Sequence, residues 1–144
     1  MTFRGTFDHS LDAKNRLTIP SKFRASLADG VVLAKGLNPC VAVWTPDVFE
    51  AYVQRALEPW PPLSPQAETI NTFFSANSFD TELDSAGRVM LPRDLMEHGR
   101  LRKEVVVTGA GQRLEVWDRT AWVPHNASLA DEVAKITASL GHAG

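Results

Sequence analysis

The chain has 144 residues, the size of one ordinary domain, and its 44% hydrophobic and 22% charged residues exclude a disordered or fibrous polypeptide. A formal net charge of −2 and an isoelectric point near 6.1 exclude a general polycation. The single Cys40 excludes an internal disulfide and a thiolate metal cage, and without a long apolar run or leader we expect a cytoplasmic protein.

Two strands separated by a tight turn are expected first. Residues 7–11 and 17–19 have the composition of strands, the second returning after the turn. Between them, Asp12 and Arg16 could form an i,i+4 ion pair on a helix. However, Asn15 readily accepts a positive φ, and the β-forming neighbours favour a turn.

A short helix and a hairpin are expected next. Pro20 suits the first turn of a helix that fills residues 22–27. Residues 31–33 and 41–44 are rich in valine, and the Gly- and Pro-containing segment between them predicts a hairpin. Thr45 is a good N-cap, so a further helix is expected to begin after it.

The remainder of the first half predicts helices around a proline-rich segment. Residues 59–65 hold four of the nine prolines and predict a stiff connector between the halves. Residues 66–76 and 130–140 read as further helices, and the second has an apolar face formed by Val133, Ile136 and Leu140.

The pattern of the first half occurs again in the second. Residues 7–20 (FDHSLDAKNRLTIP) and 79–92 (FDTELDSAGRVMLP) are identical at six of 14 positions without a gap. Asp84 and Arg88 repeat the turn, with Gly87 in place of asparagine, and a helix, a hairpin and the N-cap residue Asp118 follow. Because a unit of about 50–60 residues is marginal alone, we expect two halves that share one core.

A strand, an Asp-x-x-x-Arg turn, a hydrophobic-Pro strand end, a short helix and a hairpin, each present twice, resemble the MraZ family of bacterial transcriptional regulators. The resemblance extends from Phe3 to about Val123. It implies an α+β fold, a double-split (swapped-hairpin) β-barrel of two pseudo-symmetric repeats decorated by short helices. The boundaries it implies are 5–47 and 77–120 for two AbrB-type modules, 48–76 for a helix and Pro-rich connector, and 121–144 for a C-terminal helical tail.

The same resemblance implies a sequence-specific regulator that binds double-stranded DNA at direct repeats upstream of the division and cell-wall gene cluster. It implies a nucleoid-associated homo-oligomer, a ring, with no enzyme activity, cofactor, membrane partner or small-molecule substrate. An antidote-like protein-interaction module of the same fold stays open as an alternative. An enzyme that uses the turn aspartates is a second rival.

The two turns carry the candidate chemistry. The planar guanidinium of an arginine can form two hydrogen bonds with the O6 and N7 atoms of guanine, and an aspartate four residues earlier holds it in place. Alternatively, both Asp–Arg pairs could be structural clasps, ion pairs whose only role is to close the turn. Between Arg4 and Arg24 five cations face two acids, whereas between Phe79 and Lys103 five face five, so Arg16 is expected to matter more than Arg88. The candidate DNA-binding residues are Arg16, Lys14, Asn15, Asp12, Arg88, Asp84, Arg4, Lys22 and Arg24.

Other chemistry-bearing residues do not form a motif. The histidines are dispersed without metal-ligand spacing, and Cys40 has no activating base nearby in sequence, so no catalytic or metal site is expected. The tryptophans could stack on single-stranded bases, but the symmetric strand-end positions of two of them favour core packing. These residues are His9, His98, His125 and His142, and Trp44, Trp60, Trp117 and Trp122.

Overall fold

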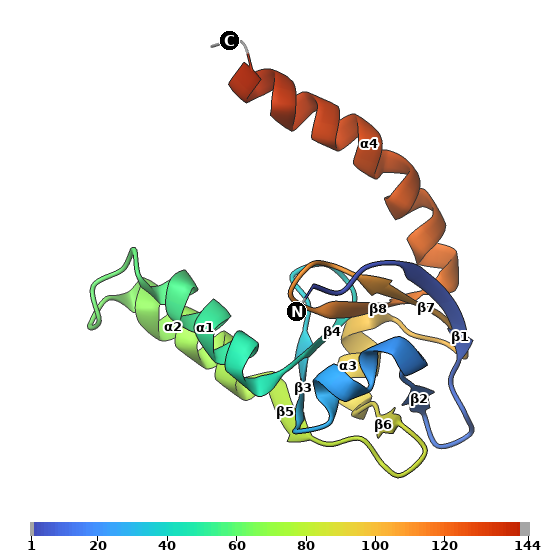
Figure 1. Cartoon of the computed structure of the whole chain (residues 1–144). Coiled ribbons are helices and arrows are strands. Elements are labelled where there is room, and N and C mark those ends of the chain that lie inside the picture. Colours follow the sequence, from blue (N-terminus) through green and yellow to red (C-terminus); the bar gives the residue numbers. More distant parts are fainter. Residues whose placement is uncertain (1, 142–144) are drawn as a thin grey trace.

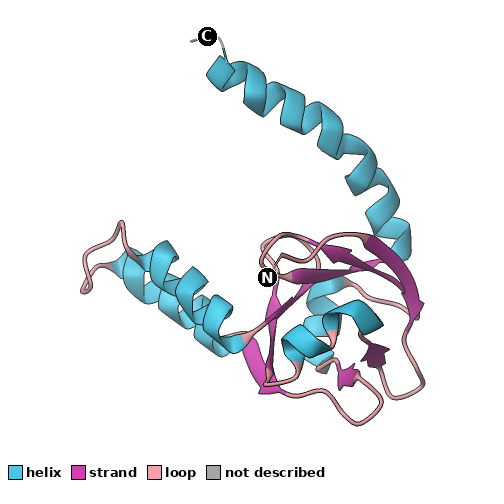
Figure 2. Cartoon of the chain, viewed as in Figure 1, coloured by secondary structure: helices cyan, strands magenta, loops and turns pink. Residues whose placement is uncertain are grey.

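The computed structural model describes residues 2–141 as an α+β molecule with a mostly antiparallel sheet, shown in Figures 1 and 2. A six-stranded sheet has the order β1-β7-β8-β4-β3-β5, and β2 and β6 form a separate two-stranded sheet. The strands are β1 (Thr6–Ser10), β2 (Arg16–Thr18), β3 (Val31–Lys35), β4 (Val41–Trp44), β5 (Ser78–Thr81), β6 (Arg88–Met90), β7 (Glu104–Gly109) and β8 (Leu114–Asp118). The helices are α1 (Pro46–Leu57), α2 (Pro65–Ala76), α3 (Arg93–Gly99) and α4 (Arg119–Gly141), with 3-10 turns η1 (Ser21–Phe23) and η2 (Ala25–Leu27).

The two repeats exchange their first strands. β1 of the first repeat pairs with β7 of the second, and β5 of the second repeat pairs with β3 of the first. β2 pairs with β6, so the expectation that residues 17–19 return along residues 7–11 is wrong as to the strand partner. The edges of the larger sheet are β1 and β5, and hydrogen bonds do not close it into a barrel.

One core fills the space between the two sheets and is shared by both repeats. Leu17 and Val89, which face each other across β2 and β6, are 0% and 1% exposed. Leu33 and Val107 enter the same cluster from the larger sheet. Fully burying a side chain of this size contributes about 1.5–3 kcal/mol, so neither repeat would keep this core if it were separated from the other.

A second, smaller core covers the outer face of β3 and β4. Trp44 packs against Phe49 and Tyr52 of α1, and Phe74 of α2 closes the cluster. The expected strands at 31–33 and 41–44 therefore read as continuous apolar runs because both of their faces are buried. The proline-rich residues 59–65 connect α1 to α2 at the far end of this helical hairpin (Figure 1).

The expected helices differ from the observed ones in two places. Residues 22–27 form two 3-10 turns, with hydrogen bonds such as Phe23 N–H to the Pro20 carbonyl, whereas the equivalent α3 is an α-helix. The helix expected at 130–140 is continuous with the one that follows Asp118, and together they make the 23-residue α4. None of the helices within residues 2–141 is long and apolar enough to cross a membrane.

Candidate nucleic-acid interface

The β2–β6 ribbon has one buried face and one outward face. Its register pairs Arg16 with Met90, Leu17 with Val89 and Thr18 with Arg88. Because side chains alternate along a strand, Leu17 and Val89 point into the core, and the other four share the outward face. Arg16 and Arg88 are thus diagonal neighbours, with Cα atoms roughly 7–8 Å apart, on the same face of one ribbon.

The first turn is closed by a network of hydrogen bonds to one carboxylate. Asp12 Oδ1 accepts from the backbone N–H groups of Lys14 and Arg16, each at 2.9 Å, and Oδ2 accepts from Arg16 Nε at 2.7 Å. These contacts lower the pKa of Asp12, chiefly through the backbone N–H of Arg16. No side-chain partner within residues 2–141 occupies the terminal amino groups of Arg16.

The second turn repeats this network atom for atom. Asp84 Oδ1 accepts from Ala86 N–H and Arg88 N–H, and Oδ2 accepts from Arg88 Nε, all at 2.9 Å. The pKa of Asp84 is lowered, again chiefly by the backbone N–H of the arginine. The arginine side chains are 27% exposed at Arg16 and 32% exposed at Arg88, so both reach the surface. Figure 1 shows the two turns at one end of the molecule, away from α4.

The turns support each other across the repeats. Ile19 N–H donates to the Gly87 carbonyl at 2.9 Å, and Leu91 N–H donates to the Asn15 carbonyl at 3.0 Å, which extends the ribbon into both turns. Arg24 from the first repeat lies against the second turn, where a Cβ on Gly87 would come within 2.5 Å of Arg24 Nε. The strand exchange therefore makes each turn depend on residues of the other repeat.

Most of the candidate residues lie at the two turns, whereas Lys22 and Arg4 lie beside or before β1. Lys14 is exposed at the first turn, but Arg24 donates from Nε to the Ile19 carbonyl at 2.9 Å and so holds the ribbon. The ammonium of Lys22 lies 5.1 Å from the ring centroid of Phe23, beside β1. Arg4 precedes β1 whereas the turn follows it, so five strand residues, about 17 Å, separate the two.

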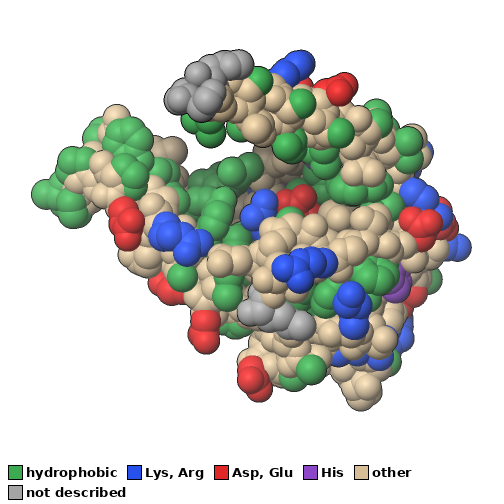
Figure 3. Space-filling model, turned by 45° about the horizontal axis from the view of Figure 1, so that its top comes forward, with side chains coloured by type: hydrophobic (Ala, Val, Ile, Leu, Met, Phe, Trp, Pro, Cys, Tyr) green, Lys and Arg blue, Asp and Glu red, His purple; other side chains and the backbone are tan. Residues whose placement is uncertain are grey.

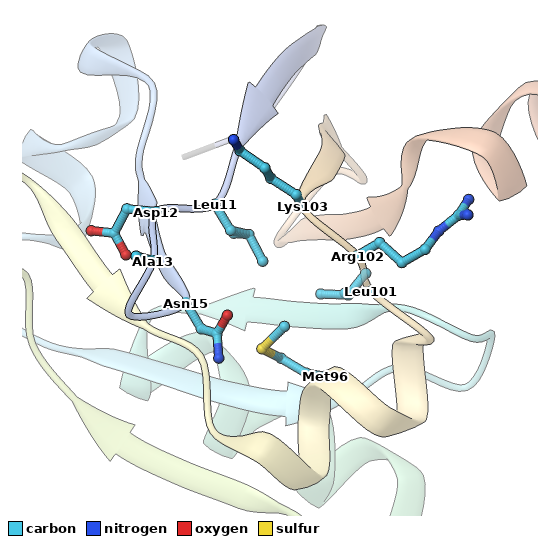
Figure 4. Close-up of a pocket in the computed structure, with 8 residues that line it drawn as sticks. All are labelled: Leu11, Asp12, Ala13, Asn15, Met96, Leu101, Arg102 and Lys103. Atoms are coloured by element: carbon cyan, nitrogen blue, oxygen red, sulfur yellow. The ribbon is translucent and has the colours of Figure 1, made fainter.

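Sequence reasoning missed a group of residues beside the first turn. A pocket of about 430 Å³ lies between Asp12 and Asn15 on one side and Met96, Leu101 and Lys103 on the other (Figure 4). An adjoining hollow is lined by Asn15 together with Arg93 and Arg100. The segment 100–103 has three cations in four residues, a visible signal, but only the strand exchange places it beside the first turn.

The cysteine, the tryptophans and the histidines were the other residues considered for a chemical role. Burial raises the pKa of the Cys40 thiol to about 12, which keeps it neutral. Trp44 and Trp117 are each 3% exposed, as expected for core residues, whereas Trp60 at the tip of the helical hairpin is 41% exposed. No group of three or more potential metal-ligating side chains occurs in the described part of the chain, and His142 lies outside it.

Comparison with known proteins identifies relatives along nearly the whole chain. A family model described as "MraZ protein, putative antitoxin-like" matches twice, over residues 2–68 and 74–139. The chain is 34% identical to the transcriptional regulator MraZ of Alkaliphilus oremlandii over 142 residues, 96% of this chain and 99% of that protein. It is 36% identical to the protein of the same name from Clostridium acetobutylicum, over 90% of each chain.

Proposed function

Because this chain belongs to the MraZ family, we propose that it is a transcriptional regulator that recognises specific sequences in double-stranded DNA. It acts at direct repeats upstream of the division and cell-wall gene cluster. The observation that carries this proposal is the pair of Asp–Arg clasps on the outward face of the β2–β6 ribbon.

The geometry of the clasps suits base recognition. Each aspartate holds its arginine through Nε, which leaves the terminal amino groups to form a bidentate pair with the O6 and N7 atoms of guanine. Fixing the side chain in advance reduces the rotamer entropy lost on binding. The spacing of roughly 7–8 Å between Arg16 and Arg88 is about two base-pair steps, so both arginines fit one major groove about 12 Å wide.

Assembly and location complete the proposal. The regulator is a cytoplasmic, nucleoid-associated homo-oligomer, a ring, whose copies meet successive DNA repeats. A single ribbon offers few contacts, and linked copies raise the overall affinity by about 10²–10⁴. The exchanged strand pairing supports the swapped-hairpin arrangement of modules at 5–47 and 77–120. The proposal keeps a connector at 48–76 and a helical tail at 121–144, of which residues 142–144 lie outside the described part of the chain.

Substitution of the two arginines tests base recognition. Arg16→Ala is expected to weaken binding to the DNA upstream of the gene for this protein by about 10–100-fold, the loss of about 1–3 kcal/mol per bidentate pair. Arg88→Ala is expected to weaken it less, because Ala86 replaces the neighbouring cation Lys14. Fluorescence anisotropy on this duplex, and on a scrambled duplex of equal composition, measures both effects.

A charge-conserving variant separates recognition from simple attraction. Arg16→Lys keeps the cation but loses the planar fork, so it is expected to lose the preference for the upstream duplex while its salt dependence stays unchanged. Arg55→Ala, on α1, is the control and is expected to bind like the wild type. Equal binding of the wild type to both duplexes would contradict the proposed function.

One observation favours a second candidate, an antidote-like module that binds another protein. α4 has no buried residue among those described, and Val133, Ile136 and Leu140 are 59%, 60% and 75% exposed. An apolar helix face of this kind is also what a protein partner would bind. Co-purification of a stoichiometric second protein, lost when α4 is altered, would favour this candidate over self-assembly.

A further inference from the structure

The strand exchange places a segment of the second repeat beside the first turn. The residues between α3 and β7, numbers 100–103, run past the turn, and Leu11 N–H donates to the Lys103 carbonyl at 2.8 Å. Figure 4 shows the result: Leu11 and Asn15 point toward Leu101 and Met96 across the pocket, with Lys103 at its rim. Residues 88 positions apart in sequence, Asn15 and Lys103, therefore line one surface.

Two cations of this segment are free to bind an anion. Arg100 and Lys103 are exposed, and neither has an acidic partner among residues 2–141. Arg102, by contrast, pairs with Asp118 at 3.2 Å and points away from the pocket (Figure 4). The two acids that line the pockets are engaged as well, because Asp12 pairs with Arg16 and Glu97 with Arg93.

The backbone of Arg100 gives an independent indication. Arg100 ends α3 in the left-handed conformation, with φ 51° and ψ 39°, a position where glycine is strongly preferred. Its N–H is bonded to the carbonyls of α3, so the backbone needs no particular side chain. Residues other than glycine that are held in this conformation are found preferentially at functional sites.

The first repeat lacks an equivalent group. It joins η2 to β3 through Ala28, Asp29 and Gly30, which contain one acid and no cation. We propose that Arg100 and Lys103 form a phosphate-binding patch that holds the DNA backbone beside the first turn while Arg16 faces the bases. This inference rests on the proposed function and makes the DNA contact one-sided, with the first turn as its centre.

The salt dependence of DNA binding tests this patch. Each phosphate neutralised adds about 0.9 to the slope of log affinity against log salt concentration. Arg100→Gln/Lys103→Gln is expected to reduce the slope by about two units on the upstream duplex and on the scrambled duplex alike. The preference for the upstream duplex is expected to persist, because phosphate contacts carry no sequence information.

Two further variants make the result specific. Arg55→Gln/Lys135→Gln removes one arginine and one lysine from α1 and α4, and is expected to leave the slope unchanged. Arg100→Gly suits the left-handed backbone, so the thermal unfolding midpoint is expected to rise by about 2–4 °C while the slope falls by about one unit. A gain in stability together with a loss of DNA affinity distinguishes a DNA contact from damage to the fold.

The proposed phosphate-binding patch is contradicted if the double variant keeps the wild-type salt slope while the wild type prefers the upstream duplex. That result leaves the proposed function standing. Equal wild-type binding to both duplexes overturns the proposed function instead, while a slope reduced by two units still supports the patch. A wild type that binds neither duplex overturns both.

Discussion

At the tip of each turn one residue holds a positive φ, and the two repeats use different residues for it. Asn15 has φ 57° and Gly87 has φ 75°. Asparagine and glycine both accept this conformation, but only the second turn carries Arg24 in the space that a Cβ would fill. The choice of glycine at position 87 therefore follows from the side chain of another repeat.

Gly87→Ala is expected to destabilise the protein in two ways. The left-handed conformation costs an L-residue about 1–2 kcal/mol, and the new methyl group must displace Arg24, which adds about 1–3 kcal/mol of overpacking. Gly111→Ala is the matched control, because Gly111 has φ 79° but no heavy atom within 4 Å of an added Cβ. Urea unfolding of both variants separates the backbone effect from the steric effect.

The steric part of this effect has its own check. Arg24→Ala removes the obstacle, so Gly87→Ala is expected to destabilise an Arg24→Ala background about as much as Gly111→Ala destabilises the wild type. An equal loss of stability for Gly87→Ala and Gly111→Ala in the wild type would show that Arg24 moves aside without cost.

The carboxylates of the turns predict an acid-sensitive structure. Because the pKa values of Asp12 and Asp84 are lower in the folded protein than the ordinary 3.8, their stabilisation is fully present above pH 3.8. It is lost as the pH falls through the lower folded values and the carboxylates become protonated. Thermal unfolding between pH 2 and 6 is expected to show this loss, and Asp12→Asn/Asp84→Asn is expected to flatten it.

At the scale of elements, local signals were sufficient for the turns and hairpins. Asp–Arg spacing with Asn or Gly between predicted both turns, and the valine runs before Trp44 and Trp117 predicted both hairpins. The pairing partner of each strand could not be predicted from local sequence in the same way. The pairing of β2 with β6 depends on a match between two segments about 70 residues apart, and a three-residue strand has too little pattern to specify its neighbour.

The strand exchange also changes which cationic residues lie beside which turn. A count along the chain placed Lys22 and Arg24 with the first turn and Arg100, Arg102 and Lys103 with the second. In the folded protein Arg24 supports the second turn, whereas Lys103 lies beside the first. The expectation that Arg16 matters more than Arg88 stays a prediction, but the reason for it is now Lys14 together with the segment of the second repeat.

Equivalent helices end differently because their sequences differ after the first turns. α1 stops before the proline-rich residues 59–65, and α2 returns to place Phe74 on the cluster around Trp44. Residues 132–138, at the equivalent position of the second repeat, contain no proline, so α4 continues. Among residues 2–141 the ring of Trp117 contacts those of Trp122 and His125, both from α4, and a second helix comparable to α2 does not follow.

At the scale of the whole molecule, this difference leaves an apolar surface on α4 that residues 2–141 do not bury. Figure 3 shows hydrophobic side chains along α4 and, across a hollow, on the helical hairpin. Four exposed hydrophobic residues of α4 lie at i, i+4, i+7 and i+11, on one face of the helix. They are Leu129, Val133, Ile136 and Leu140, which are 37–75% exposed. A second copy of the chain offers matching apolar groups on its own hairpin, where Leu63 is 99% exposed.

Charged substitutions on this face test whether it joins copies of the chain. Val133→Glu/Ile136→Glu is expected to convert the proposed oligomer to a monomer, since a carboxylate cannot be buried unpaired in an apolar contact. The ribbon is untouched, so the variant loses only the gain from linked copies, about 10²–10⁴ in affinity for DNA with several repeats, and binds a single repeat like the wild type. Ala134→Glu/Ala138→Glu adds the same charges to the opposite face and is expected to stay oligomeric. Sizing chromatography with light scattering measures the mass, and a wild type that is already monomeric would remove α4 from the assembly.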